Sequence, residues 1–432
     1  MELKRIRGAV ALSVAAASLA ACGGGGDEGS ASGDDVTLTY WASNQGTSLE
    51  NDMEVLQPQL DAFTEETGIE VDVEVVPWSD LLNRILAATA SGEGPDVLNI
   101  GNTWSASLQA TGALMPFDDA AMEEIGAADR FLAGSLSATG AEGQPPTAVP
   151  LYSLAYGLYY NKAAFAEAGI TEPPATWEDV IADGQKLTTA DRWGMSIEGG
   201  SVSENIHDVF VFAKQQGGDF FDSDGKPTFD TPENVAGIKQ YVDLIQTDKI
   251  ANPSNAEYSN GTEALADFAS GKSAMVMWQA AAGSLEELGM DPADVGVVPI
   301  PAPAGAEDVS SIVAGINLAV FDNTDYKDEA LQFVEFMTST ENQIALNKTY
   351  GSLPSVTDAY TDPAFQTEAV ETFKSILDDR SVPMPAVAEE SQFETLVGTA
   401  VKNMLAEAAS GDEVTEDEIS EQLAAAQQQL GG

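Results

Sequence analysis

From residue 36 onward, the hydrophobic side chains follow two alternating patterns. Residues 36–41 (VTLTYW) and 69–76 (IEVDVEVV) carry apolar side chains at every second position, which is typical of a strand with one buried face. Between these runs, residues 53–67 repeat apolar side chains at helical spacing. The next helix and the next strand are predicted over residues 81–90 and 96–100. Strands that alternate with helices predict an α/β fold, with a parallel sheet covered by helices on both faces.

A longer apolar run follows further along the chain. Residues 149–160 are rich in aromatic and β-branched side chains, which predicts one buried strand. Residues 161–168 predict a short helix that ends at Gly169, a residue suited to the left-handed position after a helix. Thr176, followed three positions later by Asp179, predicts a capping box that opens another helix.

The N-terminal residues have the pattern of a secretion signal. In residues 1–22, three basic residues precede an apolar stretch that is too short to span a bilayer. Residues 19–22 (LAAC) match the bacterial lipobox, in which the signal peptide is cut before a cysteine that is then acylated. Cys22 is the only cysteine, so the chain can form no internal disulfide. Residues 23–35, nearly all Gly, Ser and Asp, predict a flexible tether between the lipid and the folded body.

Length and charge narrow the possible architecture and partners. At 432 residues, the chain is longer than one hydrophobic core usually serves, so about two or three domains are expected. Its 70 Asp and Glu residues stand against 18 Lys and Arg, a formal net charge of −52. Such a surface repels nucleic-acid phosphates and anionic lipid headgroups. Neither is therefore an expected partner of the folded body.

The loops after the first and third predicted strands are the candidate binding site, because ligands of open α/β sheets bind at the carboxyl ends of strands. The side chains there are polar or aromatic: Trp41, Ser43, Asn44, Gln45, Asn102, Thr103 and Trp104. Pyranose rings pack their C–H faces on indole, while their hydroxyls need planar hydrogen-bonding groups, so this mixture predicts a sugar site. The alternative is that Trp41 and Trp104 each fill the core of their own domain. Three other tryptophans are assigned to packing: Trp78, Trp177 and Trp193.

Short sequence patches along most of the chain occur in a recognisable order. They are residues 38–41, 67–69, 92–96, 159–162 (YYNK), 174–177 (PATW), 268–275 (FASGKSAM), 298–301 (VPIP), 314–317 (AGIN) and 351–354 (GSLP). This order resembles the extracellular solute-binding proteins of family 1, the maltose-binding-like subunits of ABC importers that capture sugars.

The resemblance implies a two-lobed periplasmic-binding-protein fold of type II. Each lobe would contain a mixed sheet flanked by helices, and a hinge of about three crossings would join the lobes. By the order of the patches, lobe one comprises residues 36–150 plus 317–372, and lobe two comprises residues 151–316 plus 373–432. The apolar run that begins at residue 149 would then be one of the crossings.

The resemblance also implies a second wall for the sugar site. Residues 203–208, before a helix that ends at Gly217, fall where members of the family contact sugar. The candidate contacts of this wall are Tyr156, Asn205, His207, Trp278, Glu390 and Gln392. Glu390, Gln392 and Glu394 are expected in the loop after residues 383–385, where a solvated role is the alternative. Near Trp278 the chain departs from many relatives, which have Gly-Pro-Trp a little further on.

Enzyme motifs fail on inspection. Residues 271–273 (GKS) lack the earlier glycine of a phosphate-binding loop, because position 266 is alanine. Residues 222–225 (DSDG) have the wrong spacing for a calcium loop and predict a hairpin turn. His207 is the only histidine, which argues against a histidine metal site and a Ser-His-Asp triad.

The sequence therefore predicts a binding protein rather than an enzyme. It would capture a sugar, with an oligosaccharide favoured, between two lobes and deliver it to ABC permease subunits, and a separate subunit would use ATP. It would be a monomer without cofactor or metal, anchored to the outer face of the cell membrane through its N-terminal lipid only. Two alternatives remain: the same fold for another solute, such as a polyamine, metal chelate or phosphorylated compound, and a lipid-anchored sugar hydrolase.

Overall fold

The computed structural model describes residues 36–141, 143–259 and 262–431. The predicted signal segment over residues 1–22, with its lipidation site Cys22, and the predicted tether over residues 23–35 lie outside these described residues. Within the described part of the chain, no helix combines the length and the apolarity needed to cross a membrane.

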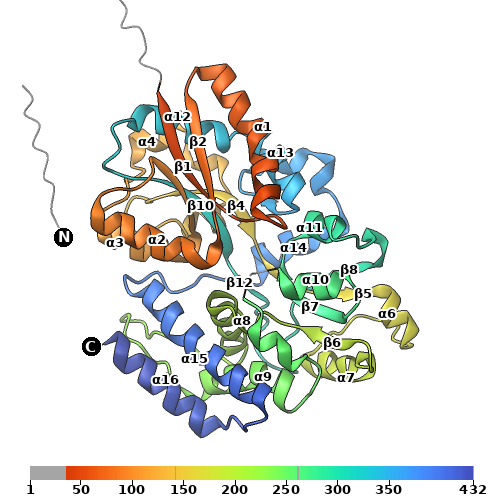
Figure 1. Cartoon of the computed structure of the whole chain (residues 1–432). Coiled ribbons are helices and arrows are strands. Elements are labelled where there is room, and N and C mark those ends of the chain that lie inside the picture. The colour runs from red at the N-terminus through yellow and green to blue at the C-terminus, as the bar shows by residue number, and fades with distance from the viewer. Residues whose placement is uncertain (1–35, 142, 260–261, 432) are drawn as a thin grey trace, which may run out of the picture. The chain divides into compact units, whose positions relative to one another are not determined.

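The first of two large sheets is built mainly from the N-terminal third of the chain (Figure 1). Its strand order is β11-β4-β10-β3-β1-β2. Its strands are β1 Thr37–Ser43, β2 Glu70–Val76, β3 Val97–Gly101, β4 Val149–Leu154, β10 Ala314–Val320 and β11 Leu353–Pro354. β1, β2 and β3 are parallel, as predicted, whereas β10 returns antiparallel between β3 and β4. The sheet is therefore mixed.

Helices cover both faces of this sheet, which confirms the expected layering. They include α1 Leu49–Thr67, α2 Trp78–Ser91, α3 Ser105–Thr111, α4 Asp119–Glu124, α5 Ala133–Ser137, α12 Lys327–Met337 and α13 Thr340–Tyr350. The alternation of side chains decides which face each strand residue serves. Val97 of β3 packs in the cluster with α1, α12 and α13, whereas its neighbours Leu98 and Ile100 pack with α2 and α3.

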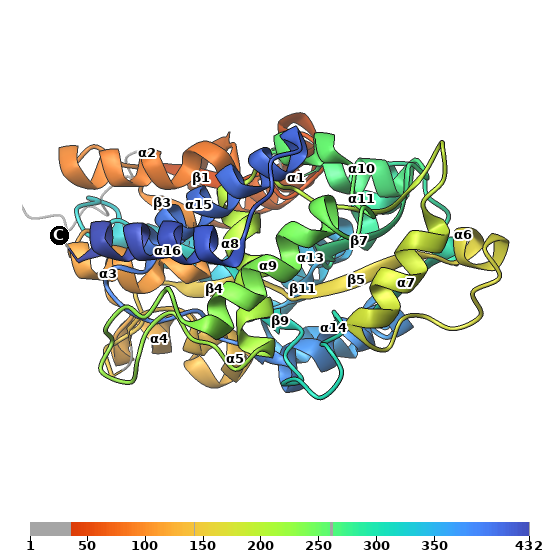
Figure 2. The ribbon, with the colours of Figure 1, turned by 90° about the horizontal axis from the view of Figure 1, so that it is seen from below.

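The second large sheet is also mixed and has the order β6-β7-β5-β8. Its strands are β5 Tyr156–Asn161, β6 Trp193–Ser196, β7 Ser273–Gln279 and β8 Val295–Val298. The helices in the same part of the chain are α6 Lys162–Glu167, α7 Trp177–Leu187, α8 Val202–Gln215, α9 Pro232–Gln246, α10 Glu263–Ala269 and α11 Ala282–Glu287. The C-terminal helices are α14 Glu368–Asp379, α15 Glu390–Ser410 and α16 Glu416–Leu430. Figure 2 shows α15 and α16 beside α8 and α9; α15 contacts both α8 and α9, and α16 contacts α9.

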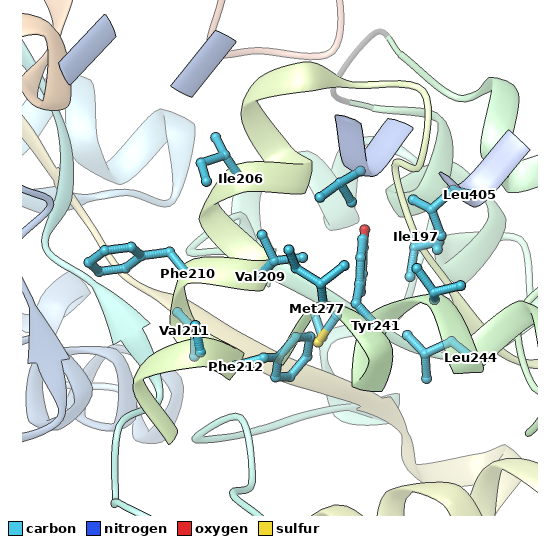
Figure 3. Close-up of a cluster of buried hydrophobic side chains, with 14 of the residues drawn as sticks. Ile197, Ile206, Val209, Phe210, Val211, Phe212, Tyr241, Leu244, Met277 and Leu405 are labelled. Carbon is cyan, nitrogen blue, oxygen red and sulfur yellow. The ribbon is translucent and has the colours of Figure 1, made fainter. Parts of the chain in front are cut away.

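The core of this second region forms around α8. Figure 3 shows Val209 and Phe212 of α8 turned toward Tyr241 and Leu244 of α9. Leu405 of α15 belongs to the same buried cluster. α8 is thus packed between other elements along most of its length, and α15 is held against it.

The local signals in the sequence are confirmed where they concern helix ends. Gly68 has φ +77° after α1, and Gly169 has φ +72° after α6. The capping box at Thr176 and Asp179 is present at the start of α7. α1 begins earlier than predicted because the side chain of Ser48 accepts a hydrogen bond from the backbone of its first turn.

The prediction of one strand over residues 149–160 is wrong. The run contains two strands, β4 and β5, which belong to different sheets and are separated only by the buried residue Ala155. The backbone N–H of Tyr156 donates to Ser311 Oγ at 2.8 Å, so it is satisfied by a side chain at the point where the chain changes sheets. Continuous apolar character could not reveal this break, because both strands are buried.

The chain passes between the two sheets at three places, which agrees with the expected hinge. The first passage is Ala155, and the second is Val313, between the short strand β9 Ser311–Ile312 and β10. The third lies between β11 and α14, which contacts β5 and β8. β9 pairs in parallel with β12 Ser381–Val382 beside these passages. The lobe limits assigned from the sequence stay a prediction.

Candidate ligand-binding site

Trp104 is the centre of a contact between elements of the two sheets. It ends η1 Asn102–Trp104, the short turn directly after β3, and is only 3% exposed. Its indole stacks on Trp78, with ring centroids 4.5 Å apart and planes at 22°. Trp104 Nε1 donates to Glu394 Oε2 of α15 at 2.9 Å. Trp78 Nε1 donates to Ser203 Oγ of α8 at 3.2 Å.

A buried hydrogen-bonded network continues from Glu394 into the second region. Glu394 Oε1 lies 3.3 Å from His207 Nε2, and His207 Nδ1 lies 2.9 Å from the hydroxyl of Tyr156. That hydroxyl donates to Glu204 Oε2 at 2.8 Å and accepts from Gln279 Nε2 at 2.8 Å. Since the Tyr156 proton goes to Glu204, both ring nitrogens of His207 face acceptors. The network therefore fits a doubly protonated imidazolium.

The electrostatics of the network agree with this protonation. Burial alone would lower the pKa of His207, but its hydrogen bond to Glu394 and the charges of Glu394, Glu204 and Asp208 raise it above the ordinary value. Burial alone would raise the pKa of Glu394, but the hydrogen bond and charge of His207 lower it. Burial raises the pKa of Glu204, and it raises the pKa values of Asp208 and Glu390 well above the usual range. The network thus combines one ion pair, Glu394 with His207, with two carboxyl groups, Asp208 and Glu390, whose pKa values are raised by burial.

We call the contact of Trp78 and Trp104 with Ser203, Glu394 and the buried network the junction. The loop after β1 belongs to its first wall, the side that carries the two tryptophans. Asn44 Oδ1 accepts from the backbone N–H of Trp78 at 2.6 Å, so this side chain fixes the start of α2. Ser43 is buried, and its Oγ accepts from Asn99 Nδ2 at 3.0 Å. Gln45 Nε2 bonds the carbonyl of Asn44 at 2.8 Å. These predicted site residues hold the loop and Trp78 in place from within their own region.

Asn102 and Thr103 line a small cavity beside the network. Asn102 Nδ2 donates to the carbonyl of Val313 at 2.7 Å, and Thr103 is a hydrogen-bond partner of Glu394. Residues 383–386 line the opposite side. The cavity volume is about 40 Å³, far below the several hundred Å³ of a typical ligand pocket. In this arrangement the two walls touch each other directly, so a sugar-sized ligand would have to separate them.

Four of the predicted site residues take no part in the hydrogen bonds of the junction described above. Trp41 is half-buried beneath the guanidinium of Arg84, 4.1 Å from its ring centroid. Trp278 is half-buried on β7 against another apolar cluster. Asn205 is fully buried and donates to the carbonyl of Gly199 at 2.9 Å. Gln392 is exposed.

Two local expectations near these residues are corrected. Residues 203–208 do not precede a helix but lie inside α8, which begins at Val202 after the capping residue Ser201. Helical spacing places Glu204, His207 and Asp208 together and turns Asn205 away. Glu390, Gln392 and Glu394 are not in a loop but in the first two turns of α15.

The sequence argument missed several residues of the junction. Trp78 was assigned to packing, and Glu204, Asp208 and Gln279 were not selected. Trp78 follows the carboxyl end of β2. It would have been predicted if the loop after the second strand had been included, because ligands bind at the carboxyl ends of strands. Glu204 and Asp208 would have followed from recognising the full length of α8, because they lie three and one positions from His207.

Comparison with known proteins agrees with this architecture. Residues 46–344, more than half of the chain, match the family of bacterial extracellular solute-binding proteins, and the chain belongs to that family. It is 26% identical over 359 residues to an arabinooligosaccharide-binding protein of Halalkalibacterium halodurans, covering 79% of this chain and 77% of the relative. It is 25% identical over 361 residues to the diacetylchitobiose binding protein DasA of Streptomyces coelicolor, covering 82% of each.

A solved structure shows the same fold. The chain superposes on maltose-bound MalE3 of T. maritima with a TM-score of 0.80 at 24% identity, covering 91% of this chain and 100% of that one. The protein therefore has the two-lobed maltose-binding-like fold of extracytoplasmic solute-binding proteins.

Proposed function

We propose that this protein captures an oligosaccharide between its two lobes and delivers it to the permease of an ABC importer. The observation that carries the proposal is the Trp78–Trp104 stack, whose polar edges bond Ser203 and Glu394 from the facing helices. Indole faces beside carboxylates and amides are the groups that recognise the C–H faces and hydroxyls of sugars. The family and the sugar ligands named for the relatives above support the same assignment.

Capture would work through competition for the same groups. With the walls apart, the Trp104–Glu394 and Trp78–Ser203 hydrogen bonds would open, so these side chains could contact the ligand, and closure would place the sugar against both walls at once. A ligand that contacts both lobes only in the closed form shifts the population toward that form by its difference in affinity. The closed, loaded form would then dock on the permease, while a separate subunit uses ATP.

The cellular setting is part of the same proposal. The family is extracytoplasmic, and the lipobox at residues 19–22 supports anchoring through acylated Cys22. Two acyl chains on that residue would supply stable membrane attachment, with residues 23–35 as tether. We infer a monomer that needs no cofactor and does not transform its ligand.

A panel of mono- and oligosaccharides, with polyamines and chromogenic glycosides included, tests the proposal. Binding is followed by tryptophan fluorescence and by thermal unfolding, since Trp78 and Trp104 lie at the site. A ligand at a hundredfold excess over its Kd raises the free energy of unfolding by about 2.7 kcal/mol. Oligosaccharide binding without turnover is expected. Binding of polyamines alone, or hydrolysis of a glycoside, would contradict the proposal.

A further inference from the structure

The junction contains four carboxyl groups from two helices. Glu204 and Asp208 come from α8, and Glu390 and Glu394 come from α15. None is more than 7% exposed. Among the described residues, the only basic side chain paired with any of them is His207, which bonds Glu394. The ion pairs that Lys and Arg make within the described residues all involve other Asp and Glu side chains.

Glu390 is a second and separate observation. Its side chain is fully buried, and within the described residues neither carboxyl oxygen makes a hydrogen bond of good geometry; the polar side chains that act on its pKa, Glu394 and Ser391, belong to its own helix. It lies beside Glu394, one helical turn further along α15. The next residue, Ser391, bonds Ser107 of α3, so this first turn faces the segment that carries Trp104. Buried polar atoms in native proteins normally have partners, and an unpartnered carboxyl at a binding junction indicates that a ligand supplies the donor.

We propose that the junction selects carbohydrates that carry a protonated amine, and that Glu390 and Glu394 receive this ammonium group. The inference depends on the proposed sugar-capture function and names its substrate class. An ammonium group offers three donors and a positive charge, which matches both the unpartnered oxygens and the excess of carboxyls. The Trp78–Trp104 stack is a suitable neighbour, because indole faces attract cations as well as pyranose C–H groups.

Other ligand chemistries fit this junction less well. A neutral hydroxyl could bond Glu390 but would bring no charge to the carboxyls. A phosphorylated or carboxylated solute would face four acids with only His207 in compensation. Within the described residues, no three His, Cys, Asp or Glu side chains are arranged to hold a metal ion, which argues against a metal at this cluster.

Matched sugar pairs test the inference. Maltotriose and cellotriose are each compared with the analogue in which an amine replaces one hydroxyl of every ring, by calorimetry at neutral pH. We expect the amine-bearing member of the recognised pair to bind at least about tenfold more tightly, equivalent to about 1.4 kcal/mol. Equal or tighter binding of the neutral member would overturn this inference and leave sugar capture standing. If no carbohydrate binds at all, the proposed function itself fails.

The variant Glu390→Gln tests whether Glu390 causes the preference for amine-bearing sugars, and Glu389→Gln is the matched control. Both changes remove one formal charge from the same end of α15, but Glu389 is exposed. Glu390→Gln should reduce the amine preference to less than about threefold. Glu389→Gln should keep the full preference. An unchanged preference in Glu390→Gln, with its folding verified by thermal unfolding, would contradict the assignment.

Discussion

Phe393 and Glu394 are adjacent on α15 but belong to two different kinds of structure. Phe393 packs against Phe220, Phe221 and Phe229, with ring centroids 5.1 to 5.3 Å away. All these rings belong to one buried cluster around the second sheet. Glu394 instead bonds Trp104, which follows β3 of the first sheet, and His207 of α8.

Phe393 stabilises the second region alone, whereas Glu394 connects the second region to the first. The aromatic cluster is complete, because each ring finds its partners within the region. The junction is incomplete, since within the described residues Glu390 makes no hydrogen bond of good geometry and the four carboxyl groups share one histidine. Unpaired buried polar groups cost free energy in the folded protein, so a ligand that supplied donors at the junction would be stabilised there.

Phe393→Ala should have the largest effect, and it should be an effect on stability. Loss of a buried Phe side chain from a packed cluster costs about 3–5 kcal/mol of the free energy of unfolding. Urea denaturation measures this loss, and Phe393→Leu should lose less because it leaves a smaller cavity. The folded fraction should bind ligand as before. A large change in Kd at unchanged stability would break the comparison.

Trp104→Ala should show the opposite profile. The sugar loses a stacking surface and a donor next to Glu394, so we expect binding to weaken by about 2 kcal/mol, or about 30-fold. Stability in the absence of ligand should change less than in Phe393→Ala. Trp104→Phe keeps a ring but loses the N–H group and should bind with intermediate affinity. Calorimetric titration with the ligand identified by the panel measures all three proteins.

Stability should rise as the pH is lowered from about 8 to about 5. Burial raises the pKa of Glu390 and Asp208, and it raises the pKa of Glu198 to about 7. The pKa of His207 is also raised, mainly by Glu394 against the effect of burial. In each case the folded protein binds more protons than the unfolded chain between the two pKa values. The free energy of unfolding therefore falls as the pH increases through that range.

Glu390→Gln isolates one contributor to this pH dependence. It should make the free energy of unfolding fall less steeply between pH 5 and pH 8, because it removes one group whose pKa is raised in the folded protein. Glu389→Gln, which changes the formal charge equally, should keep the wild-type slope. Urea denaturation at several pH values tests both. Maximum stability at pH 8 would contradict the assigned directions.

Arg84→Ala should have the smallest effect. Arg84 lies over Trp41 and pairs with Glu74 at a solvent-exposed position. Such contacts contribute about 1 kcal/mol or less, and salt screens them. Sugar affinity should not change, because Trp41 takes no part in the hydrogen bonds that join the Trp78–Trp104 stack to α8 and α15. A strong loss of binding would instead place Trp41 in the ligand site, and Trp41 and Trp104 would then no longer differ in role.

Periodicity predicted the first sheet well, because each element there carries its own signal. The strands β1, β2 and β3 and the helices between them follow from alternation and helical spacing. The division of residues 149–160 at Ala155 could not be predicted, since two buried strands in series have the same composition as one. Contacts between residues far apart in sequence could not be predicted either; Trp78 and its partner Ser203, for example, are 125 positions apart. The chemistry of the site was thus visible in its residue types, but the pairing of its residues was not.

The short connection at Ala155 couples bending of the backbone to the chemistry of the junction. Only one residue separates β4 from β5, so this connection contains no slack to absorb a rotation of one sheet against the other. Tyr156 is the next residue, and its hydroxyl bonds both Glu204 and His207. A rotation at the connection would therefore move the phenol ring, so opening of the protein would also change the hydrogen bonds of Tyr156 to Glu204 and His207. An isotope label on the Tyr156 ring would report both at once.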